Sequence, residues 1–250
     1  MKKISESQKV TLTLGQLKRL VRESASDEND FEIEDGVLVK YHGNGGDVVI
    51  PNKVWNIGEE AFAGCTGLIS VTIPDSVESI GELAFDRCHN LKSVTIPNSV
   101  ISIGWGAFED CENITSVIIP DAMTSIESSL FEGCTSLKSV TIPDSVTEIG
   151  VQAFYWCTKL RRLTIPDSVI SIGEEAFCGC SGLETINVAN EKQKERLLNG
   201  DNHFSPSVKI IVKGEESDDG YEVTENESGT RFIGNRIDEL KDELNAEFGG

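Results

Sequence analysis

A single 23-residue interval governs most of this chain. Proline recurs at that spacing six times, at Pro51, Pro74, Pro97, Pro120, Pro143 and Pro166. Phenylalanine and cysteine keep the same spacing in two further series: Phe62, Phe85, Phe108, Phe131, Phe154 and Phe177, and Cys65, Cys88, Cys111, Cys134, Cys157 and Cys180. A fixed period of about 20–50 residues is the sequence signature of solenoids and related arrays. The chain is therefore expected to fold as six stacked copies of one unit.

The copy from Pro74 to Ile96 indicates how one unit folds. Its last four residues alternate polar and apolar, which predicts a short β-strand with one buried face. The proline that opens the next copy ends this strand, because it has no backbone N–H to donate. Ala84, Phe85 and Cys88 are spaced as on a helix, but the segment allows only a turn or two. The inward residues of this copy are Val77, Ile80, Ala84, Phe85, Cys88, Leu91, Val94 and Ile96.

No single coil can surround that many apolar groups, so the coils must cover one another, with strands about 4.8 Å apart. The repeated pattern Leu-x-x-Val-x-Ile-Pro-x-x-Val-x-x-Ile-Gly-x-x-Ala-Phe-x-x-Cys resembles the BspA-type leucine-rich repeat, a family of bacteria and some protozoa. The match covers about residues 51–188, and residues 35–41 and 43–51 are similar to the family's N-terminal cap. The resemblance implies a β-rich repeat solenoid: a right-handed superhelix with a parallel sheet on the inner curve, short helical turns and capped ends. It also implies protein binding, often at bacterial cell surfaces, and no catalytic residues.

Five segments are predicted along the chain. They are an N-terminal segment with a short basic helix and a linker (1–30), a capping hairpin (31–50), six repeats (51–188), a C-terminal cap of one helix and one strand (189–213), and an acidic tail with a short amphipathic helix (214–250). Asn190 and Gln193 are spaced as a capping box at the start of the cap helix. The glycines of residues 43–46 place the hairpin turn between two alternating runs. Residues 214–229 are acidic and poor in apolar groups, which favours disorder or a loose loop.

The formal net charge of −20 and the pI near 4.5 exclude some partners. Such a field repels nucleic acid and anionic lipid, so neither nucleic-acid binding nor membrane insertion is expected. No apolar run reaches the length of a membrane span. The N-terminal lysines are not followed by the 7–15-residue apolar core of a signal peptide. We therefore expect a cytoplasmic protein, with the cell surface, or secretion by a route not visible in the sequence, as the alternative.

The cysteine spacing argues against zinc and against disulfides. Zinc sites use short pairs such as Cys-x-x-Cys, whereas these cysteines fall once per coil. Stacked neighbours are near enough for a disulfide by Cα distance, but equivalent side chains in register point the same way. A column of reduced, buried thiols is expected, with Cys178 as an exposed exception that fits a reducing cytosol. No metal and no cofactor are expected.

Two groups of residues are candidates for binding a protein partner. Strand residues between the inward ones are expected to form a uniform face of small side chains: Ser70, Thr72, Ser93, Thr95, Ser116, Ile118, Ser139, Thr141, Arg162, Thr164, Thr185 and Asn187. Ile118 and Arg162 break this uniformity. The second group is an aromatic rim: Trp55, Trp105, Tyr155 and Trp156. The alternatives are a solvated strand face without a partner, and aromatic side chains that only shield neighbouring coils.

Catalysis is not expected from this chain. Its three histidines, His42, His89 and His203, fall in unrelated parts of the repeat pattern, and no glycine-rich phosphate loop follows a strand. The sequence favours a non-catalytic, monomeric interaction module that recognises an unknown protein through the inner sheet face or the aromatic rim. A bacterial cell-surface adhesin and a structural scaffold are the alternative functions. The fourth coil departs most from the pattern, with Met123, Glu127 and Leu130 at positions that other copies give to Val, Gly and Ala.

Overall fold

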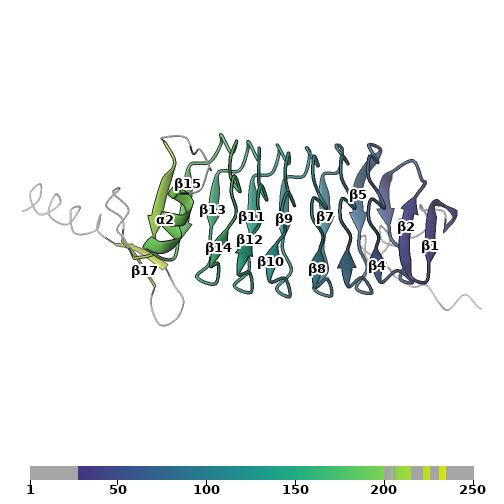
Figure 1. Ribbon diagram of the computed structural model, residues 1–250, viewed down its shortest axis with the longest axis horizontal. Coiled ribbons are helices and arrows are strands. Elements are labelled where there is room, and N and C mark those ends of the chain that lie inside the picture. Colours follow the sequence, from purple (N-terminus) through teal and green to yellow (C-terminus); the bar gives the residue numbers. More distant parts are fainter. Residues whose placement is uncertain (1–27, 200–203, 205–206, 215–221, 226–230, 235–250) are drawn as a thin grey trace, which may run out of the picture.

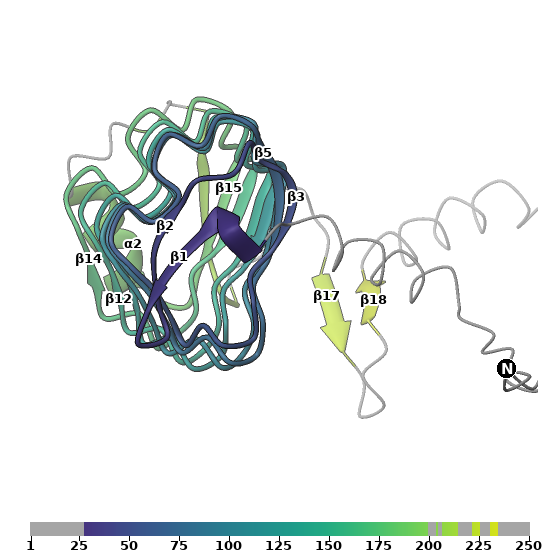
Figure 2. The same ribbon diagram turned by 90° about the vertical axis from the view of Figure 1, so that its right-hand side faces the viewer.

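The repeats form an elongated stack of coils. The computed structural model describes residues 28–199, 204, 207–214, 222–225 and 231–234. Each 23-residue copy makes one turn of the stack and contributes two short strands (Figure 1). The end-on view shows these strands on opposite sides of the coil (Figure 2). The predicted parallel-sheet solenoid of the leucine-rich-repeat type is confirmed.

The strand that the alternating pattern predicts lies on one side, which we call the hydroxyl sheet. It comprises β3 (Gly46–Val49), β5 (Leu68–Thr72), β7 (Ser93–Thr95), β9 (Ser116–Ile118), β11 (Ser139–Thr141), β13 (Arg162–Thr164), β15 (Thr185–Val188) and β16 (Lys209–Val212). Hydrogen bonds join these strands in three parallel groups, β3-β5-β7, β9-β11 and β13-β15-β16. Equivalent residues oppose one another, as Ser70 opposes Ser93. The coils are therefore stacked in register.

A second ladder of two-residue strands, which we call the short-strand sheet, runs along the other side. It comprises β4 (Asn56–Ile57), β6 (Ser79–Ile80), β8 (Ser102–Ile103), β10 (Ser125–Ile126), β12 (Glu148–Ile149) and β14 (Ser171–Ile172). The repeat pattern predicts that the apolar residue of each pair points inward, but it predicts no strand here, since two residues carry no readable period. This ladder is split into two parts, because β8 and β10 are not hydrogen-bonded to each other.

A single replacement explains the split. At Gly104 and Gly150 an added Cβ would lie 2.6 and 2.5 Å from a backbone nitrogen of the preceding coil, which is closer than a side chain can approach. The amide of Gly104 donates to the Ile80 carbonyl at 2.8 Å across this contact. Glu127 occupies the same position in the fourth coil. Its Cβ holds the third and fourth coils apart, and the rings of Phe108 and Phe131 show the widest spacing of the repeat phenylalanines, 5.8 Å.

The short helical turns expected after each glycine are wrong. Within residues 51–188 of the described chain, this segment is a series of turns without an α-helix. In the second coil Leu83 and Arg87 have φ values of 52° and 54°, in the left-handed region that a right-handed helix excludes. Alternate backbone N–H groups donate along the stack, as when Phe85 N donates to the Ala107 carbonyl at 2.8 Å, and those between them close local turns, as when Asp86 N donates to the Leu83 carbonyl at 3.0 Å. Stacking bonds and turn bonds together therefore satisfy the backbone N–H groups of this segment.

The core consists of columns that run the length of the stack. The six repeat phenylalanines are at most 1% exposed and stack with ring centroids 4.9–5.8 Å apart. Tyr41 extends this column, with its ring 4.9 Å from that of Phe62. All seven cysteines are free thiols, and five of the six repeat cysteines are buried as expected; Cys65 and Cys178 are half-buried, so the expected burial of Cys65 and the expected exposure of Cys178 are wrong. Cys88 Sγ donates to the Phe62 carbonyl of the preceding coil at 3.2 Å, and four later repeat cysteines make the equivalent bond.

The N-terminal end is built differently from the prediction. After a 3-10 turn, η1 (Glu28–Asp30), the antiparallel hairpin is formed by β1 (Phe31–Glu34) and β2 (Val37–Tyr41). The predicted turn at residues 43–46 is wrong, since that loop instead leads from β2 to β3, which pairs in parallel with β5. Asp35-Gly36 makes the turn, because both residues adopt positive φ, 47° and 79°, as two-residue hairpin turns require.

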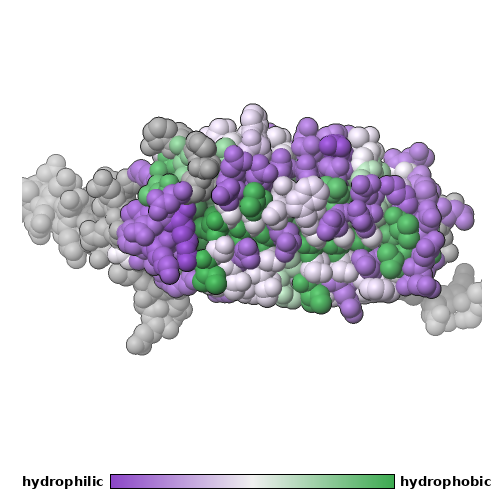
Figure 3. All heavy atoms as spheres, in the orientation of Figure 1, coloured by the Kyte–Doolittle hydropathy of each residue, from purple (hydrophilic) through white to green (hydrophobic). Residues whose placement is uncertain are grey.

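The C-terminal cap contains one helix, α2 (Glu191–Asn199), followed by β16. The Asn190 side chain accepts the predicted bond from Gln193 N at 3.0 Å, but Gln193 Oε1 accepts from Ala189 N and not from Asn190. The Gln193 amide also donates to the carbonyls of Pro166 and Val169, which fixes the helix to the last coil. Figure 3 shows hydrophilic residues gathered over α2.

Two further strands, β17 (Glu222–Glu225) and β18 (Arg231–Gly234), pair antiparallel. The expectation of a loose loop over residues 214–229 is therefore wrong at Glu222–Glu225. The terminal helices predicted within residues 1–30 and 214–250 lie outside the described residues. Among the described residues, no helix combines the length and the apolar character that crossing a bilayer demands.

Candidate functional site: the hydroxyl face

The structure brings the predicted strand residues together on one surface, which we call the hydroxyl face. Strands β7, β9, β11 and β13 share one pattern, in which the middle residue is buried and the two flanking residues are exposed. The face comprises Ser70, Thr72, Ser93, Thr95, Ser116, Ile118, Ser139, Thr141, Arg162, Thr164, Thr185 and Asn187. Parallel pairing sets equivalent residues side by side, as with Thr72 and Thr95. The face is therefore a set of rows of small polar side chains.

Side chains of the face make hydrogen bonds near both of its ends. Ser70 Oγ donates to Asp47 near the N-terminal end. Asn187 Nδ2 donates to Thr164 Oγ1 at 3.4 Å near the C-terminal end. These bonds order the polar groups along the direction of the stack.

Ile118 and Arg162 are the two departures from this uniformity. Ile118 is 74% exposed, more than any other large hydrophobic residue that the structure describes, and it is paired with Thr141. Arg162 lies two strands further along and is also exposed. Its neighbour Arg161 is paired with Glu184, whereas Arg162 makes no ion pair with any residue that the structure describes. An apolar group and a guanidinium are therefore displayed on an otherwise hydroxyl-rich surface.

The aromatic candidates do not join this face. Trp55 directly precedes β4 and Trp105 lies two residues after β8, so both belong to the short-strand side. Tyr155 and Trp156 lie in the turn segment of the fifth coil. Since the two sheets are on opposite sides of the coil (Figure 2), the sequence-predicted residues form separate surfaces.

Two of the tryptophans have local partners. Trp55 Nε1 donates to the Asp35 carbonyl at 2.9 Å, and its ring covers Gly36, so this side chain fastens the N-terminal hairpin. Trp156 covers Gly179 of the next coil, where an added Cβ would meet the indole at 2.6 Å. Their exposed fractions are still 47% and 53%, and that of Trp105 is 43%. Tyr155 is half-buried.

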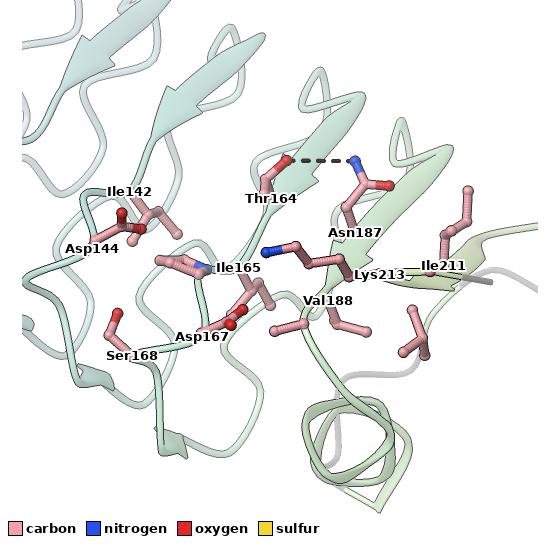
Figure 4. A pocket seen from close by; sticks show the side chains of 14 residues that line it. Ile142, Asp144, Thr164, Ile165, Asp167, Ser168, Asn187, Val188, Ile211 and Lys213 are labelled. Carbon is pink, nitrogen blue, oxygen red and sulfur yellow. Dashed lines mark hydrogen bonds between the residues drawn. The ribbon is translucent and has the colours of Figure 1, made fainter. Parts of the chain in front are cut away.

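A hollow adjoins the C-terminal end of the hydroxyl face. The sequence did not predict it. It has a volume of about 890 Å³. Figure 4 shows the Lys213 side chain extending toward Ile165, with the carboxylates of Asp144 and Asp167 on the side of the preceding coils. Ala189 stands where a seventh repeat would have proline, so the chain turns into α2 and leaves this space open. The end of the 23-residue period, marked by Ala189 in place of proline, is the feature of the sequence that could have predicted this hollow.

The described titratable groups give no arrangement for nucleophilic chemistry. Burial raises the pKa of the Cys88 and Cys180 thiols to about 12, and it also raises the pKa of the three thiols between them well above the ordinary value. These sulfurs therefore stay protonated at neutral pH, and a thiol is a weak nucleophile. His42 pairs with Glu32 in the N-terminal hairpin. His89 belongs to the second coil, with Nδ1 3.0 Å from the Asp110 carbonyl oxygen, and His203 lies outside the described residues.

Comparisons with known proteins agree with this geometry. A sequence profile described as the BspA type leucine-rich repeat region matches residues 40–160 and 101–198, in six copies. No curated protein matches the chain significantly.

Several solved structures are similar. A leucine-rich repeat protein of T. pallidum is 26% identical, with a TM-score of 0.60, over 74% of this chain and 99% of that one. A leucine-rich cell surface protein of Faecalibacterium prausnitzii A2-165 is 29% identical, with a TM-score of 0.50, over 81% of this chain and 58% of that one. A leucine-rich repeat protein of Bacteroides ovatus ATCC 8483 is 25% identical, with a TM-score of 0.52, over 71% of this chain and 54% of that one.

Proposed function

The chain belongs to the BspA-type leucine-rich repeat family, and on this premise we propose that it is a non-catalytic module that binds a protein partner through the hydroxyl face. The observation that carries the proposal is the 74% exposed Ile118 in the middle of a regular row of small polar side chains. A solvated sheet face has no need of an isoleucine at this position. A partner that covers the face removes its side chain from water.

The composition of the face suits recognition. Serine and threonine lose little side-chain entropy when they are covered, and each hydroxyl both donates and accepts hydrogen bonds. Arg162 adds a planar group with several donors, a residue type that is enriched among the strongest contacts of protein interfaces. The net charge of −20 favours association with a positively charged partner. We place the module in the cytoplasm as a monomer.

The test uses two isoleucines of similar exposure on opposite sides of the stack. Ile118 is 74% exposed on the hydroxyl face, and Ile170 is 65% exposed next to the short-strand sheet. Partners are captured from native lysate on the immobilised full chain, identified by mass spectrometry, and their affinities are measured for each variant. We expect Ile118→Asp and Arg162→Glu each to weaken binding by at least about tenfold, which is about 1.4 kcal/mol. Ile170→Asp should bind as the wild type does.

If Ile170→Asp or Trp156→Ala abolishes binding while Ile118→Asp does not, the hydroxyl face is the wrong surface. Circular dichroism of each variant confirms that the fold is retained, since exposed substitutions usually change stability by no more than about 0.5 kcal/mol. Binding that survives both substitutions on the hydroxyl face also contradicts the proposal.

A role at the cell surface is the second candidate, favoured by the likeness to the Faecalibacterium protein, which is described as a cell surface protein. Protease treatment of intact cells separates the two locations. A cytoplasmic protein is protected until the cells are lysed, whereas a surface protein is cleaved at once.

A further inference from the structure

Apolar side chains are exposed on the short-strand side of the first three coils. Trp55 directly precedes β4, and Ile101 directly precedes β8 at the equivalent position two coils later. Trp105 lies two residues after β8. The exposed fractions of Trp55, Ile101 and Trp105 are 47%, 63% and 43%. We call these three residues the short-strand patch.

The patch belongs to two rows that run along the stack. Glu78 N donates to the Trp55 carbonyl and Ile101 N donates to the Glu78 carbonyl, both at 2.9 Å, so these three residues follow one another in the first row. The second row, on the other side of the short strands, contains Glu59, Glu82 and Trp105 at equivalent positions of the same coils. Each coil has a serine or an asparagine and a glycine between the two rows. The surface is therefore a strip of small residues bordered by larger side chains, along which an elongated segment can lie.

The other members of the two rows are acidic. Glu59, Glu78 and Glu82 are exposed, and none of their carboxylates is hydrogen-bonded or ion-paired to a residue that the structure describes. Lys40 of the N-terminal hairpin donates to the Glu60 carbonyl instead. An occupant that complements this surface therefore has an apolar face flanked by positive charges.

One segment of this chain has that composition. Residues 12–22 (LTLGQLKRLVR) lie outside the described residues, and the sequence predicts a short basic helix there. Thr13 and Gln16 are spaced as a capping box, and Leu17, Leu20 and Val21 share one face of the helix. The remaining positions of its last two turns include the cations Lys18, Arg19 and Arg22.

The charges of the segment and of the rest of the chain are opposite. Residues 1–22 contain six basic residues and one acidic residue, a formal charge of +5. Since the whole chain carries −20, residues 23–250 carry −25. Attraction between the two parts therefore favours docking of the segment on the acidic rows.

The point of attachment places the segment within reach of the patch. The described chain begins at Glu28 and enters at Phe31 the sheet β1-β2-β4-β6-β8, whose last strand adjoins Ile101 and Trp105. The six residue steps from Arg22 to Glu28 span up to about 20 Å. Strands β1 and β8 are four strand spacings apart, which is about 19 Å. A helix over residues 13–22 is about 15 Å long and covers the three coils of the patch, which extend over about 10 Å.

We propose that residues 12–22 dock on the short-strand patch of their own chain as a basic amphipathic helix. The leucine face covers the apolar side chains of the patch, and the lysine and arginines lie against the carboxylates of the two rows. An isolated helix this short is marginal in water, so it needs the surface that it covers. The short tether keeps the segment at a high effective concentration, so a weak contact is sufficient.

Docking leaves the hydroxyl face open, because the two sheets lie on opposite sides of the coil (Figure 2). The proposal therefore does not depend on the partner proposed for that face.

The test measures acrylamide quenching of single tryptophans in the full chain. One variant keeps only Trp105, the other two tryptophans being replaced by phenylalanine, and a matched control keeps only Trp156. The described residues leave these two side chains 43% and 53% exposed, yet we expect Trp105 to be quenched much less than Trp156. Leu17→Asp combined with Leu20→Asp should raise the quenching of Trp105 to that of Trp156 and leave Trp156 unchanged. Raising the salt from 0.1 to 1 M should also expose Trp105, since the Debye length falls from about 10 to about 3 Å.

Tryptic cleavage after Arg19 and Arg22, with the products identified by mass spectrometry, is the second readout. Cleavage follows the population of the undocked segment, so Ile101→Asp should accelerate it by at least about tenfold. Ile170→Asp is the matched control, because Ile170 occupies the same position of the repeat three coils further on and is 65% exposed, against 63% for Ile101. This control should be cleaved at the rate of the wild type. Circular dichroism of each variant confirms that the solenoid is folded.

Equal quenching of Trp105 and Trp156 in the chain with the native segment would overturn the proposal. So would a cleavage rate that Ile101→Asp leaves unchanged. Protection that grows with protein concentration assigns the segment to the patch of a second copy. Protection that appears only with vesicles of phosphatidylserine and phosphatidylcholine assigns it to a membrane surface. Either of these last two results also rejects docking within one chain.

Discussion

Removing one ring from the phenylalanine column tests the stacking energetics most sharply. Phe108 is 0% exposed and stacks on Phe85 at 5.2 Å and on Phe131 at 5.8 Å. Truncating a buried phenylalanine to alanine costs about 3–5 kcal/mol, from lost transfer energy and from the cavity that remains. Each stacked pair contributes about 0.5–1.5 kcal/mol beyond buried area, and Phe108 takes part in two. We therefore expect Phe108→Ala to lie in the upper half of that range.

This loss is large for the whole protein. Domains are typically stable by about 5–15 kcal/mol, so Phe108→Ala should remove a major part of the free energy of unfolding. Urea denaturation monitored by circular dichroism measures this free energy. The slope of the free energy against urea concentration is compared between variants, because a changed slope means that a different amount of surface is exposed on unfolding. Phe108→Leu retains most of the volume and should cost about 1.5 kcal/mol, which keeps the test readable if the alanine variant does not fold. The matched control is Ile118→Ala on the surface, which should change stability by less than about 0.5 kcal/mol. A cost for Phe108→Ala no greater than that of Ile118→Ala would refute a continuous buried column.

Three further outcomes are expected. With a thiol reagent, half-buried Cys65 and Cys178 should react first and the five buried repeat cysteines only on unfolding; replacing both Cys65 and Cys178 by serine should remove the fast phase, and equal rates for all seven thiols would contradict the buried column. For Glu109, the folded pKa of about 7 exceeds the ordinary 4.5, so its contribution to stability is full below about pH 4.5 and is lost as pH rises through 7. The free energy of unfolding of Glu109→Gln should therefore exceed that of the wild type at pH 8 and approach it at pH 4.5, and an unchanged difference would exclude this titration. Gly150→Ala should cost about 1–3 kcal/mol by chemical denaturation, because its Cβ would meet Ser128 N at 2.5 Å, whereas Glu127→Ala should be nearly neutral; similar costs would refute the explanation of the split ladder.

The sequence predicted the parts of the fold that repeat. The 23-residue period placed every inward residue of the copy from Pro74 correctly, because each coil meets its neighbours through the same positions. It failed where local signals were read in isolation. The segment around Phe85, with its helix-like spacing, forms turns, since hydrogen bonds to the next coil alternate with local turn bonds and leave no continuous helical ladder. The Asp35-Gly36 turn was hidden inside an alternating run, while the more conspicuous glycines at 43–46 were not a hairpin turn.

The candidate binding residues were likewise predictable where they follow from the repeat and not where they depend on the shape of the coil. The hydroxyl face follows from strand alternation and register, so its residues were predictable one by one. The sequence did not predict that the aromatic residues lie away from that face, because this depends on which side of the coil each position occupies. Acidic residues follow the core phenylalanine in three successive coils, at Asp86, Glu109 and Glu132. That row was visible in the sequence, but only the stack shows that Asp86 and Glu109 come together with Asp110, one carboxylate oxygen of each lying within 4.8 Å of the others.

The central claim is that the coils stack in register and so unite the rows of the hydroxyl face. Pulsed electron paramagnetic resonance between spin labels at Ser70 and Arg162 tests it directly, after Cys65 and Cys178 are replaced by serine. The two positions are equivalent and four coils apart. Strands about 4.8 Å apart predict a narrow distance distribution that corresponds to a backbone separation of about 19 Å. A broad distribution, or a separation more than twice that value, would contradict the stack and the binding face together.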